Sequence, residues 1–197
     1  FAIIRSMRIL ITGTTGGIGG AVVSVAAGGG HDVVALNRPE WGTLGTFLEG
    51  QQPFDGVVFA TGFCCVKPLS RIEDADFTDM LSVNCGLFLR LMRELLRRRL
   101  LSKTGARVVA ISSISAEEGW PGGALYCASK GALSSLCRAM DAELVSRGVR
   151  VHALEPRYVR TKMFDMFAGR MGVPPLNAEE PIRFAERILK ELKIEGD

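Results

Sequence analysis

The sequence predicts a three-layer α/β fold, in which a doubly wound parallel sheet lies between two layers of helices. Short, continuous apolar runs such as residues 8–12 predict strands that are buried on both faces. These runs alternate along the chain with longer segments whose apolar residues recur at helical spacing. Strands that alternate with helices are joined by crossover connections, which is the arrangement of a parallel sheet.

The boundaries of the elements follow from glycine, proline and polar residues between the apolar runs. We expect strands at residues 7–13, 31–38, 55–62, 105–113 and 149–156. We expect helices at residues 16–29, 73–101, 125–148 and 179–193. Residues 39–54 predict a loop or a short helix. Residues 157–181 show no clear period, so we expect an irregular segment that acts as a lid.

The size and composition of the chain predict one globular domain over residues 1–197. Hydrophobic residues make up 47% of the sequence and charged residues 23%. The formal net charge of +3 is too small to indicate a nucleic-acid partner. No uninterrupted apolar run is long enough to span a membrane, so we expect no membrane partner.

The five cysteines favour a reducing compartment over a disulfide scaffold. Their number is odd, they form no Cys-x-x-Cys pair, and the two histidines, His31 and His152, stand apart in the sequence. This pattern lacks the ligand spacing of a zinc site. We therefore expect a cytoplasmic protein without a metal centre.

A glycine-rich turn, TGTTGGIG at residues 12–19, follows the first predicted strand and opens the first helix. Gly13 permits a tight turn, whereas Gly17 and Gly19 allow backbone or ligand to approach where a Cβ atom would collide. The N–H groups at the start of the helix favour a pyrophosphate there. An ordinary strand-to-helix turn can have the same composition, but the position of this one favours dinucleotide binding, with Thr15 and Ile18 in the same turn.

The end of the second predicted strand indicates which dinucleotide is bound. An acidic residue at this place would favour NAD, because it can hold the ribose hydroxyl groups. The sequence instead has Asn37 and Arg38. An arginine without a neighbouring carboxylate favours the 2′-phosphate of NADP, although Arg38 is also consistent with an ordinary surface loop residue. We expect NADP, with NAD as the weaker alternative.

A tyrosine and a lysine stand four residues apart in the third predicted helix, so Tyr126 and Lys130 share one face. The ammonium group of a neighbouring lysine stabilises a phenolate and lowers the pKa of the phenol. Such a pair can exchange a proton with a carbonyl or alcohol oxygen. A tyrosine and a lysine at this spacing are common in proteins and often have only a structural role. Here, however, Ser113 ends the preceding predicted strand, where its hydroxyl could bind the same substrate oxygen.

The chain resembles the short-chain dehydrogenase/reductase family in its single-domain form. The segments that carry the resemblance are TGTTGGIG, SVNCG around Asn84, VVAISSISA, YCASKGAL and VRVHALEP, in the family's order. The resemblance implies a Rossmann fold, a nicotinamide cofactor, and Asn84, Ser113, Tyr126 and Lys130 as the catalytic set. In the family the tyrosine transfers the proton, the lysine also holds the nicotinamide ribose, the serine orients the substrate and the asparagine holds a relay water.

The turn, the second strand and the resemblance together give a set of expected cofactor-binding residues. They are Gly13, Thr15, Gly17, Ile18, Gly19, Asn37, Arg38, Ala60, Gly62, Tyr126, Lys130, Pro156, Val159 and Thr161.

Four features depart from the family pattern. Ala60-Thr61-Gly62 replaces an Asn-Asn-Ala-Gly-like turn, and Arg157 stands where the family mostly has glycine, where it could crowd the nicotinamide or reach an acidic substrate. Residues 38–55 are too few for the usual third strand, which brings an acidic residue near the adenine, and no last strand is visible. We therefore expect a sheet of about five or six strands.

The expected function is an NADP(H)-dependent oxidoreductase that reduces a carbonyl or oxidises a secondary alcohol, with Tyr126 as proton donor or acceptor. Met163, Phe164, Met166 and Phe167 favour a partly hydrophobic substrate, but the same residues are consistent with packing against the sheet or a subunit. The alternative is a shortened family member that binds a dinucleotide or a partner protein without catalysis. In the family two long helices pair across a twofold axis, so we expect a homodimer or homotetramer.

Overall fold

The computed structural model describes residues 6–171 and 177–192. Its centre is a five-stranded sheet with the order β2-β1-β3-β4-β5, in which every neighbouring pair is parallel. The strands are β1 (Arg8–Thr12), β2 (Asp32–Leu36), β3 (Gly56–Phe59), β4 (Ala106–Ile111) and β5 (Val149–Leu154). The predicted doubly wound parallel sheet is confirmed, at the lower end of the expected strand number.

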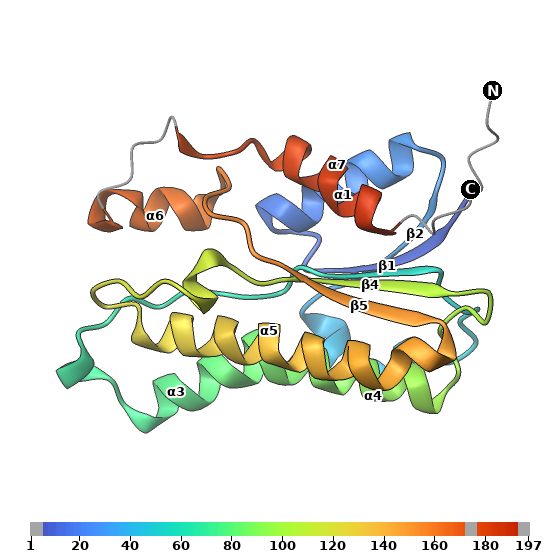
Figure 1. The fold of residues 1–197 in the computed structure, drawn as a ribbon, viewed down its shortest axis with the longest axis horizontal. Coiled ribbons are helices and arrows are strands. Elements are labelled where there is room, and N and C mark those ends of the chain that lie inside the picture. The colour runs from blue at the N-terminus through green and yellow to red at the C-terminus, as the bar shows by residue number, and fades with distance from the viewer. Residues whose placement is uncertain (1–5, 172–176, 193–197) are drawn as a thin grey trace.

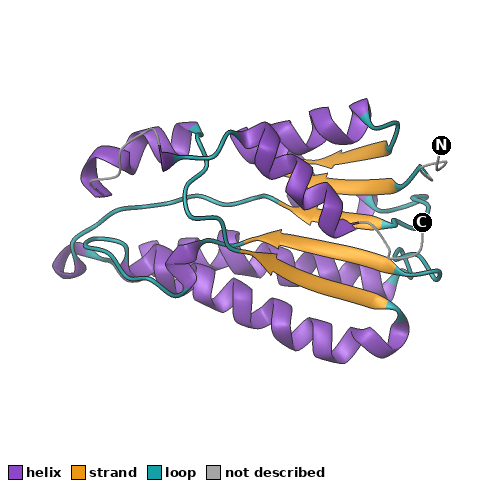
Figure 2. Ribbon diagram, turned by 45° about the horizontal axis from the view of Figure 1, so that its top comes forward, coloured by secondary structure: helices purple, strands orange, loops and turns teal. Residues whose placement is uncertain are grey.

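The direction of winding changes between β1 and β3. The chain places β2 on one side of β1 and then crosses back to place β3 on the other side. Figure 2 shows all five arrows pointing the same way, so the carboxyl ends of the strands share one edge of the sheet. Ligands of doubly wound sheets bind outside this edge, at the point where the winding changes.

Helices cover both faces of the sheet (Figure 1). One face is covered by α1 (Gly17–Gly28) and α7 (Pro181–Leu192), and the other by α4 (Leu87–Arg97) and α5 (Ala124–Leu144). Each strand supplies both cores, because successive side chains point to opposite faces. Each large aliphatic side chain that becomes fully buried stabilises the fold by roughly 1.5–3 kcal/mol.

Strand β1 shows this division clearly. Leu10 packs in the core beneath α4 and α5, whereas Ile9 and Ile11 pack in the core beneath α1 and α7, and all three are fully buried. A continuous apolar run therefore has a physical reason at this place: a strand buried on both faces has no polar side.

The long helix predicted at residues 73–101 forms, but it is divided into three segments. Helix α3 (Asp74–Leu81) is followed by a π-helical turn, η3 (Ser82–Gly86), and then by α4. A capping box involving Glu73 and Asp76 begins α3. The π turn contains the buried Asn84, and such turns occur frequently at functional sites.

The segment between β2 and β3 contains a 3-10 turn, η1 (Pro39–Trp41), and the one-turn helix α2 (Leu44–Phe47). This outcome agrees with the expected loop or short helix. Within the described ranges no further strand pairs with β2, so β2 is an edge of the sheet. No sixth strand follows β5 in the same ranges.

The expectation of an irregular segment at residues 157–181 is wrong for its middle part, because α6 (Lys162–Met171) forms there. The hydroxyl of Thr161 accepts a hydrogen bond from the backbone N–H of Phe164 (3.2 Å) and so caps the first turn. Phe164 and Ala168, four residues apart, are buried and pack together on one side of the helix. Residues 172–176 lie outside the described part of the chain.

We expect Gly19→Ala to destabilise the fold by about 3 kcal/mol, because overpacking a rigid site has this order of cost. A Cβ atom at Gly19 would lie 2.2 Å from the Gly13 carbonyl oxygen, which belongs to the backbone of the turn. Urea denaturation measures the free energy of unfolding of both proteins.

The matched control is Gly28→Ala in the same helix, where a Cβ atom would meet nothing within 4 Å. This change should stabilise the fold by about 0.5 kcal/mol through helix propensity. Equal effects of the two substitutions would contradict the close contact at Gly19.

Candidate active site

Two cavities open at the carboxyl edge of the sheet and share the loop Ala60–Phe63. The first has a volume of about 150 Å³ and the second about 580 Å³. Of the residues predicted from sequence, the first cavity is lined by Ile18, Ala60, Gly62, Ser113, Tyr126, Lys130, Pro156, Val159 and Thr161. The second is lined by Gly13, Thr15, Asn37, Arg38, Ala60 and Gly62. Gly17, Gly19 and Asn84 line neither cavity.

The glycine turn is held by close backbone contacts. Gly13 has a φ angle of +67°, which favours glycine, and a Cβ atom there would lie 2.8 Å from the Ala60 carbonyl oxygen. Gly17 leaves room for Thr161, whose methyl carbon would lie 2.7 Å from an added Cβ atom. These glycines therefore bring β1, the Ala60–Phe63 loop and the start of α6 together around the N-terminus of α1.

The residue at the end of β2 has a structural partner. The side-chain oxygen of Asn37 accepts hydrogen bonds from the Thr14 N–H and hydroxyl, both at 3.0 Å. The Asn37 N–H in turn donates to the Glu40 carboxylate (2.8 Å). Arg38 lines the second cavity and makes no hydrogen bond or ion pair within the described ranges.

The Ala60–Phe63 loop is fixed from two sides. The Thr12 hydroxyl accepts hydrogen bonds from the N–H groups of Ala60 (3.1 Å) and Thr61 (3.2 Å). The Asn84 side chain accepts from the Phe63 N–H and donates to the Phe63 carbonyl, both at 2.9 Å. Thr12 and Asn84 are fully buried, so these bonds do not compete with water.

The same contacts define what Asn84 does in this structure. Its amide nitrogen also donates to the Ser129 hydroxyl (3.0 Å), so both polar atoms of the side chain are engaged. Asn84 therefore positions the loop between the cavities. The two amide protons are used by the bonds to Phe63 and Ser129, so a relay water could bind this side chain only by donating a hydrogen bond to its oxygen.

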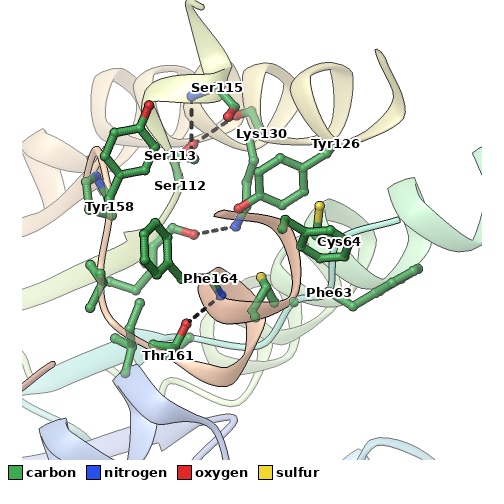
Figure 3. Close-up of a pocket in the computed structure, with 18 of the residues that line it drawn as sticks. Phe63, Cys64, Ser112, Ser113, Ser115, Tyr126, Lys130, Tyr158, Thr161 and Phe164 are labelled. Carbon is green, nitrogen blue, oxygen red and sulfur yellow. Dashed lines mark hydrogen bonds between the residues drawn. The ribbon is translucent and has the colours of Figure 1, made fainter. Parts of the chain in front are cut away.

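Tyr126, Lys130 and Ser113 meet in the first cavity (Figure 3). The Lys130 ammonium nitrogen lies 5.6 Å from the centre of the Tyr126 ring and donates to the Ile111 carbonyl (2.7 Å). The Ser113 hydroxyl accepts a hydrogen bond from the Ser115 N–H (3.1 Å), which fixes its position. The end of β4 and the helix α5 thus place three proton-handling groups in one cavity.

The two serines at the end of β4 have different surroundings. The Ser112 hydroxyl donates to the Lys130 carbonyl (3.1 Å) and accepts from the Ser134 hydroxyl (2.8 Å), so it ties β4 to α5. The Ser113 hydroxyl instead lies beside the Tyr126 phenol, whose pKa it lowers through a hydrogen bond. Ser113 is therefore the better placed of the two to meet a substrate oxygen.

Burial sets the charge of the catalytic candidates. Burial lowers the pKa of the Lys130 ammonium group to about 8. Burial also raises the pKa of the Tyr126 phenol, the Cys64 thiol adds to this effect, and the Ser113 hydroxyl opposes it. The expected lowering of the tyrosine pKa by Lys130 is not met: burial raises this pKa, and Lys130 is not among the groups that shift it. Tyr126 is therefore protonated at neutral pH, the form that can donate to a carbonyl oxygen.

Aromatic and apolar side chains form the outer wall of the first cavity. The Tyr158 and Phe164 rings pack at a centroid distance of 5.8 Å, and the Trp120 and Tyr126 rings at 6.5 Å. Met163, Phe164 and Phe167 of the predicted lid line this cavity, whereas Met166 is exposed and does not.

Arg157 lies at the rim of the first cavity and is paired rather than directed at the nicotinamide end. Its guanidinium group donates to both oxygens of Glu118, at 2.9 and 3.2 Å. Both side chains are exposed, so the pair contributes little to stability. The pair links the loop after β5 to the loop after β4 across the cavity rim.

Residues 42–169 match the family model described as short chain dehydrogenase. The chain belongs to the short-chain dehydrogenase family. It is 28% identical over 179 residues to the 3-oxoacyl-(acyl-carrier-protein) reductase FabG of Rickettsia felis, with 79% of this chain and 74% of that protein covered. The protein is thus an NAD(P)-dependent oxidoreductase of this family.

Solved structures of other short-chain dehydrogenases share the fold. The 4-hydroxyisoleucine dehydrogenase in complex with NADH has a TM-score of 0.85 at 22% identity, over 95% of this chain and 91% of that chain. A variant of the actinorhodin polyketide ketoreductase with NADPH has a TM-score of 0.77 at 20% identity, over 95% and 90% of the two chains. At this level of identity the likeness establishes the Rossmann fold.

Sequence reasoning missed several residues of this short-chain dehydrogenase that line the cavities. Phe63 and Cys64 line the first cavity and directly follow the predicted third strand, but no sequence motif marks them. Asp79, Val83 and Leu87 line the second cavity. Their four-residue spacing was a usable signal, since it places them on one helix face.

Residues 6–171 and 177–192 contain neither a membrane-spanning helix nor a cluster of metal-binding side chains. No helix there is both long and apolar enough to cross a membrane. No group of three or more His, Cys, Asp or Glu side chains in the same ranges is arranged to hold a metal ion.

We expect the stability of the wild type relative to Lys130→Met to rise between pH 8 and pH 10.5. In this window the unfolded chain keeps the Lys130 proton while the folded protein releases it, so unfolding binds protons and stability increases with pH. Below pH 8 the lysine is charged in both states and the cost of burying that charge is fully present. The full rise is about 3 kcal/mol.

Urea denaturation of both proteins at several pH values measures this difference. The buried tyrosine and cysteines are present in both proteins, so the subtraction leaves the effect of Lys130 together with its Coulombic interactions with Cys64 and Cys137. A difference that stays constant from pH 7 to pH 10 would show that burial does not shift Lys130.

Proposed function

We propose that the protein is an NADP(H)-dependent carbonyl reductase in which Tyr126 donates the proton to the substrate oxygen. The observation that carries this proposal is the meeting of Tyr126, Lys130 and Ser113 in a cavity at the carboxyl edge of the sheet. The geometry supports the same residues in the reverse direction, the oxidation of a secondary alcohol.

The residues of the two cavities fit a dinucleotide. The N-terminus of α1 and the open glycine turn suit the pyrophosphate, because unpaired helix N–H groups and the helix dipole favour an anion. The nicotinamide would lie against Ile18, Val159 and Thr161 in the first cavity, and the adenosine would lie in the second. The nicotinamide supplies or accepts the hydride when it is bound.

The preference for NADP rests on Arg38. Its guanidinium group lines the second cavity and has no partner within the described ranges, so it is available to a 2′-phosphate. The Glu40 carboxylate lies nearby but accepts a hydrogen bond from the Asn37 backbone, and it does not line the cavity.

The remaining chemistry belongs to side chains of this chain. A carbonyl oxygen between the Ser113 and Tyr126 hydroxyl groups would receive a hydrogen bond from each, which stabilises the charge that develops on it. Tyr126 then transfers its proton to this oxygen. Lys130, charged at neutral pH with a pKa of about 8, stabilises the phenolate that remains.

The walls of the first cavity favour an apolar ketone or acyl group as substrate. Among the described residues no Asp or Glu lines this cavity, and aromatic rings form much of its outer wall. Arg157, which lines this cavity, is already paired with Glu118 and is therefore not free to bind a carboxylate substrate. A 3-oxoacyl group, the substrate named for the Rickettsia relative, is one member of this class.

We expect Tyr126→Phe to lower kcat by at least about a hundredfold, because it removes the proton donor. NADPH binding should change less than about threefold, because the ring and its packing against Trp120 remain. Stopped-flow oxidation of NADPH with a panel of apolar ketones measures the rate, and nicotinamide fluorescence measures binding.

Leu133→Met is a suitable control in α5, since it preserves volume in the core away from the cavities. Full activity of Tyr126→Phe would overturn the proposed role. A wild type that binds NADPH but turns over no carbonyl of the panel would favour the alternative, a family member that binds a dinucleotide without catalysis.

We expect Arg38→Ala to weaken NADPH binding by about tenfold to a hundredfold while NADH binding changes little. The charge-assisted hydrogen bonds to the 2′-phosphate account for this range, and NADH lacks that group. Fluorescence titrations with both dinucleotides measure the two dissociation constants. Equal weakening for NADPH and NADH would contradict a contact with the 2′-phosphate.

The assembly into a homodimer or homotetramer remains a prediction. The exposed Leu89 on α4 is an apolar residue available to such a contact. Analytical ultracentrifugation distinguishes the monomer from either oligomer.

A further inference from the structure

The second cavity has one wall that the proposed reaction does not use. Helix α3, the π turn and the start of α4 contribute Asp79, Val83 and Leu87, which stand four residues apart and all line the cavity. The connection after β2 contributes Arg38 and Trp41 to the same cavity. Its volume of about 580 Å³ leaves room for a large ligand group.

This inference rests on the proposed function, since it concerns the dinucleotide. With the pyrophosphate at the glycine turn and the nicotinamide beside Tyr126, the adenosine is left to the second cavity. Adenine has two apolar faces and a polar edge that carries an exocyclic amino group. Val83, Leu87 and Trp41 offer apolar surface for its faces, and the amino group requires a hydrogen-bond acceptor.

The possible side-chain acceptors in this cavity are few. The Asn37 oxygen already accepts two hydrogen bonds from Thr14. The Thr15 hydroxyl lies in the glycine turn, where the pyrophosphate is expected. The Thr61 hydroxyl, which also belongs to a lining residue, is bonded to the buried Thr12 hydroxyl (2.9 Å). The carboxylate of Asp79 makes no hydrogen bond or ion pair to any residue of the described ranges, and it is the one carboxylate that lines the cavity.

The short connection after β2 explains why the acceptor comes from a helix. Within the described ranges β2 is an edge strand, so no neighbouring strand brings a polar residue to that side of the cavity. The stripe Asp79, Val83 and Leu87 faces the same space from α3 and α4.

We propose that Asp79 accepts a hydrogen bond from the exocyclic amino group of adenine and makes the protein selective for adenine dinucleotides. A hydrogen bond to a charged acceptor is among the stronger ones in proteins. A base with a carbonyl oxygen at this position would place a hydrogen-bond acceptor opposite the Asp79 carboxylate. Because the carboxylate is also an acceptor, no hydrogen bond could form between them.

The test compares NADPH with reduced nicotinamide hypoxanthine dinucleotide phosphate, in which a carbonyl oxygen replaces the amino group of adenine. Equilibrium binding is followed by nicotinamide fluorescence, without any substrate. We expect the wild type to bind NADPH about tenfold more tightly than the analogue. In Asp79→Asn the preference should fall to about twofold or less, because the amide can donate to the carbonyl oxygen of hypoxanthine.

The matched control is Asp74→Asn, which removes the same charge from the same helix at an exposed position that does not line the cavity. Its preference for NADPH should equal that of the wild type. Circular dichroism confirms that both variants are folded.

Three outcomes would overturn the role of Asp79: a wild type without preference, an unchanged preference in Asp79→Asn, or an equal loss of affinity for both dinucleotides. The last result would place Asp79 at the ribose or the phosphate instead of the base. These results leave the proposed reductase function intact. A wild type that binds neither dinucleotide would overturn that function together with this inference.

Discussion

The candidate active site depends on the buried hydrogen bonds that hold the loop Ala60–Phe63. Thr12 fixes the start of this loop and Asn84 fixes its end, and neither side chain is accessible to water. An unpaired buried N–H or carbonyl group costs about 1–3 kcal/mol, so each bond strongly favours this one arrangement. The loop lines both cavities and therefore helps to set the shape of each.

The π turn gives Asn84 this position. A regular helix from residue 74 to residue 97 would direct its side chains by a fixed 3.6-residue period, whereas the extra residue in the turn shifts the period once. As a result Asn84 reaches the Phe63 backbone while Val83 and Leu87 line the second cavity. One local irregularity thus both supports the loop and helps to line the second cavity.

Desolvation has opposite effects on the pKa values of the two catalytic candidates. It raises the pKa of the Tyr126 phenol and lowers that of the Lys130 ammonium group, because burial disfavours the charged form of each. The phenol therefore remains protonated at neutral pH while the lysine retains most of its charge. This combination suits proton donation to a carbonyl, with a cation beside the phenolate that forms.

The sequence by itself determined the order of strands and helices and the glycine turn, and it indicated Ser113, Tyr126 and Lys130 as candidates that the fold brings into one cavity. Local patterns carry these features, since apolar periodicity and residue spacing are readable without distant contacts. The tertiary structure alone decided the partners of Asn37, Asn84 and Arg157, which depend on residues far away along the chain. Helix α6 was not predicted from the sequence. Its cap, Thr161, and the single apolar pair Phe164 and Ala168 give only a weak helical periodicity. The sign of the Tyr126 pKa shift also required the fold, because burial is a property of the surrounding elements and not of the residue spacing.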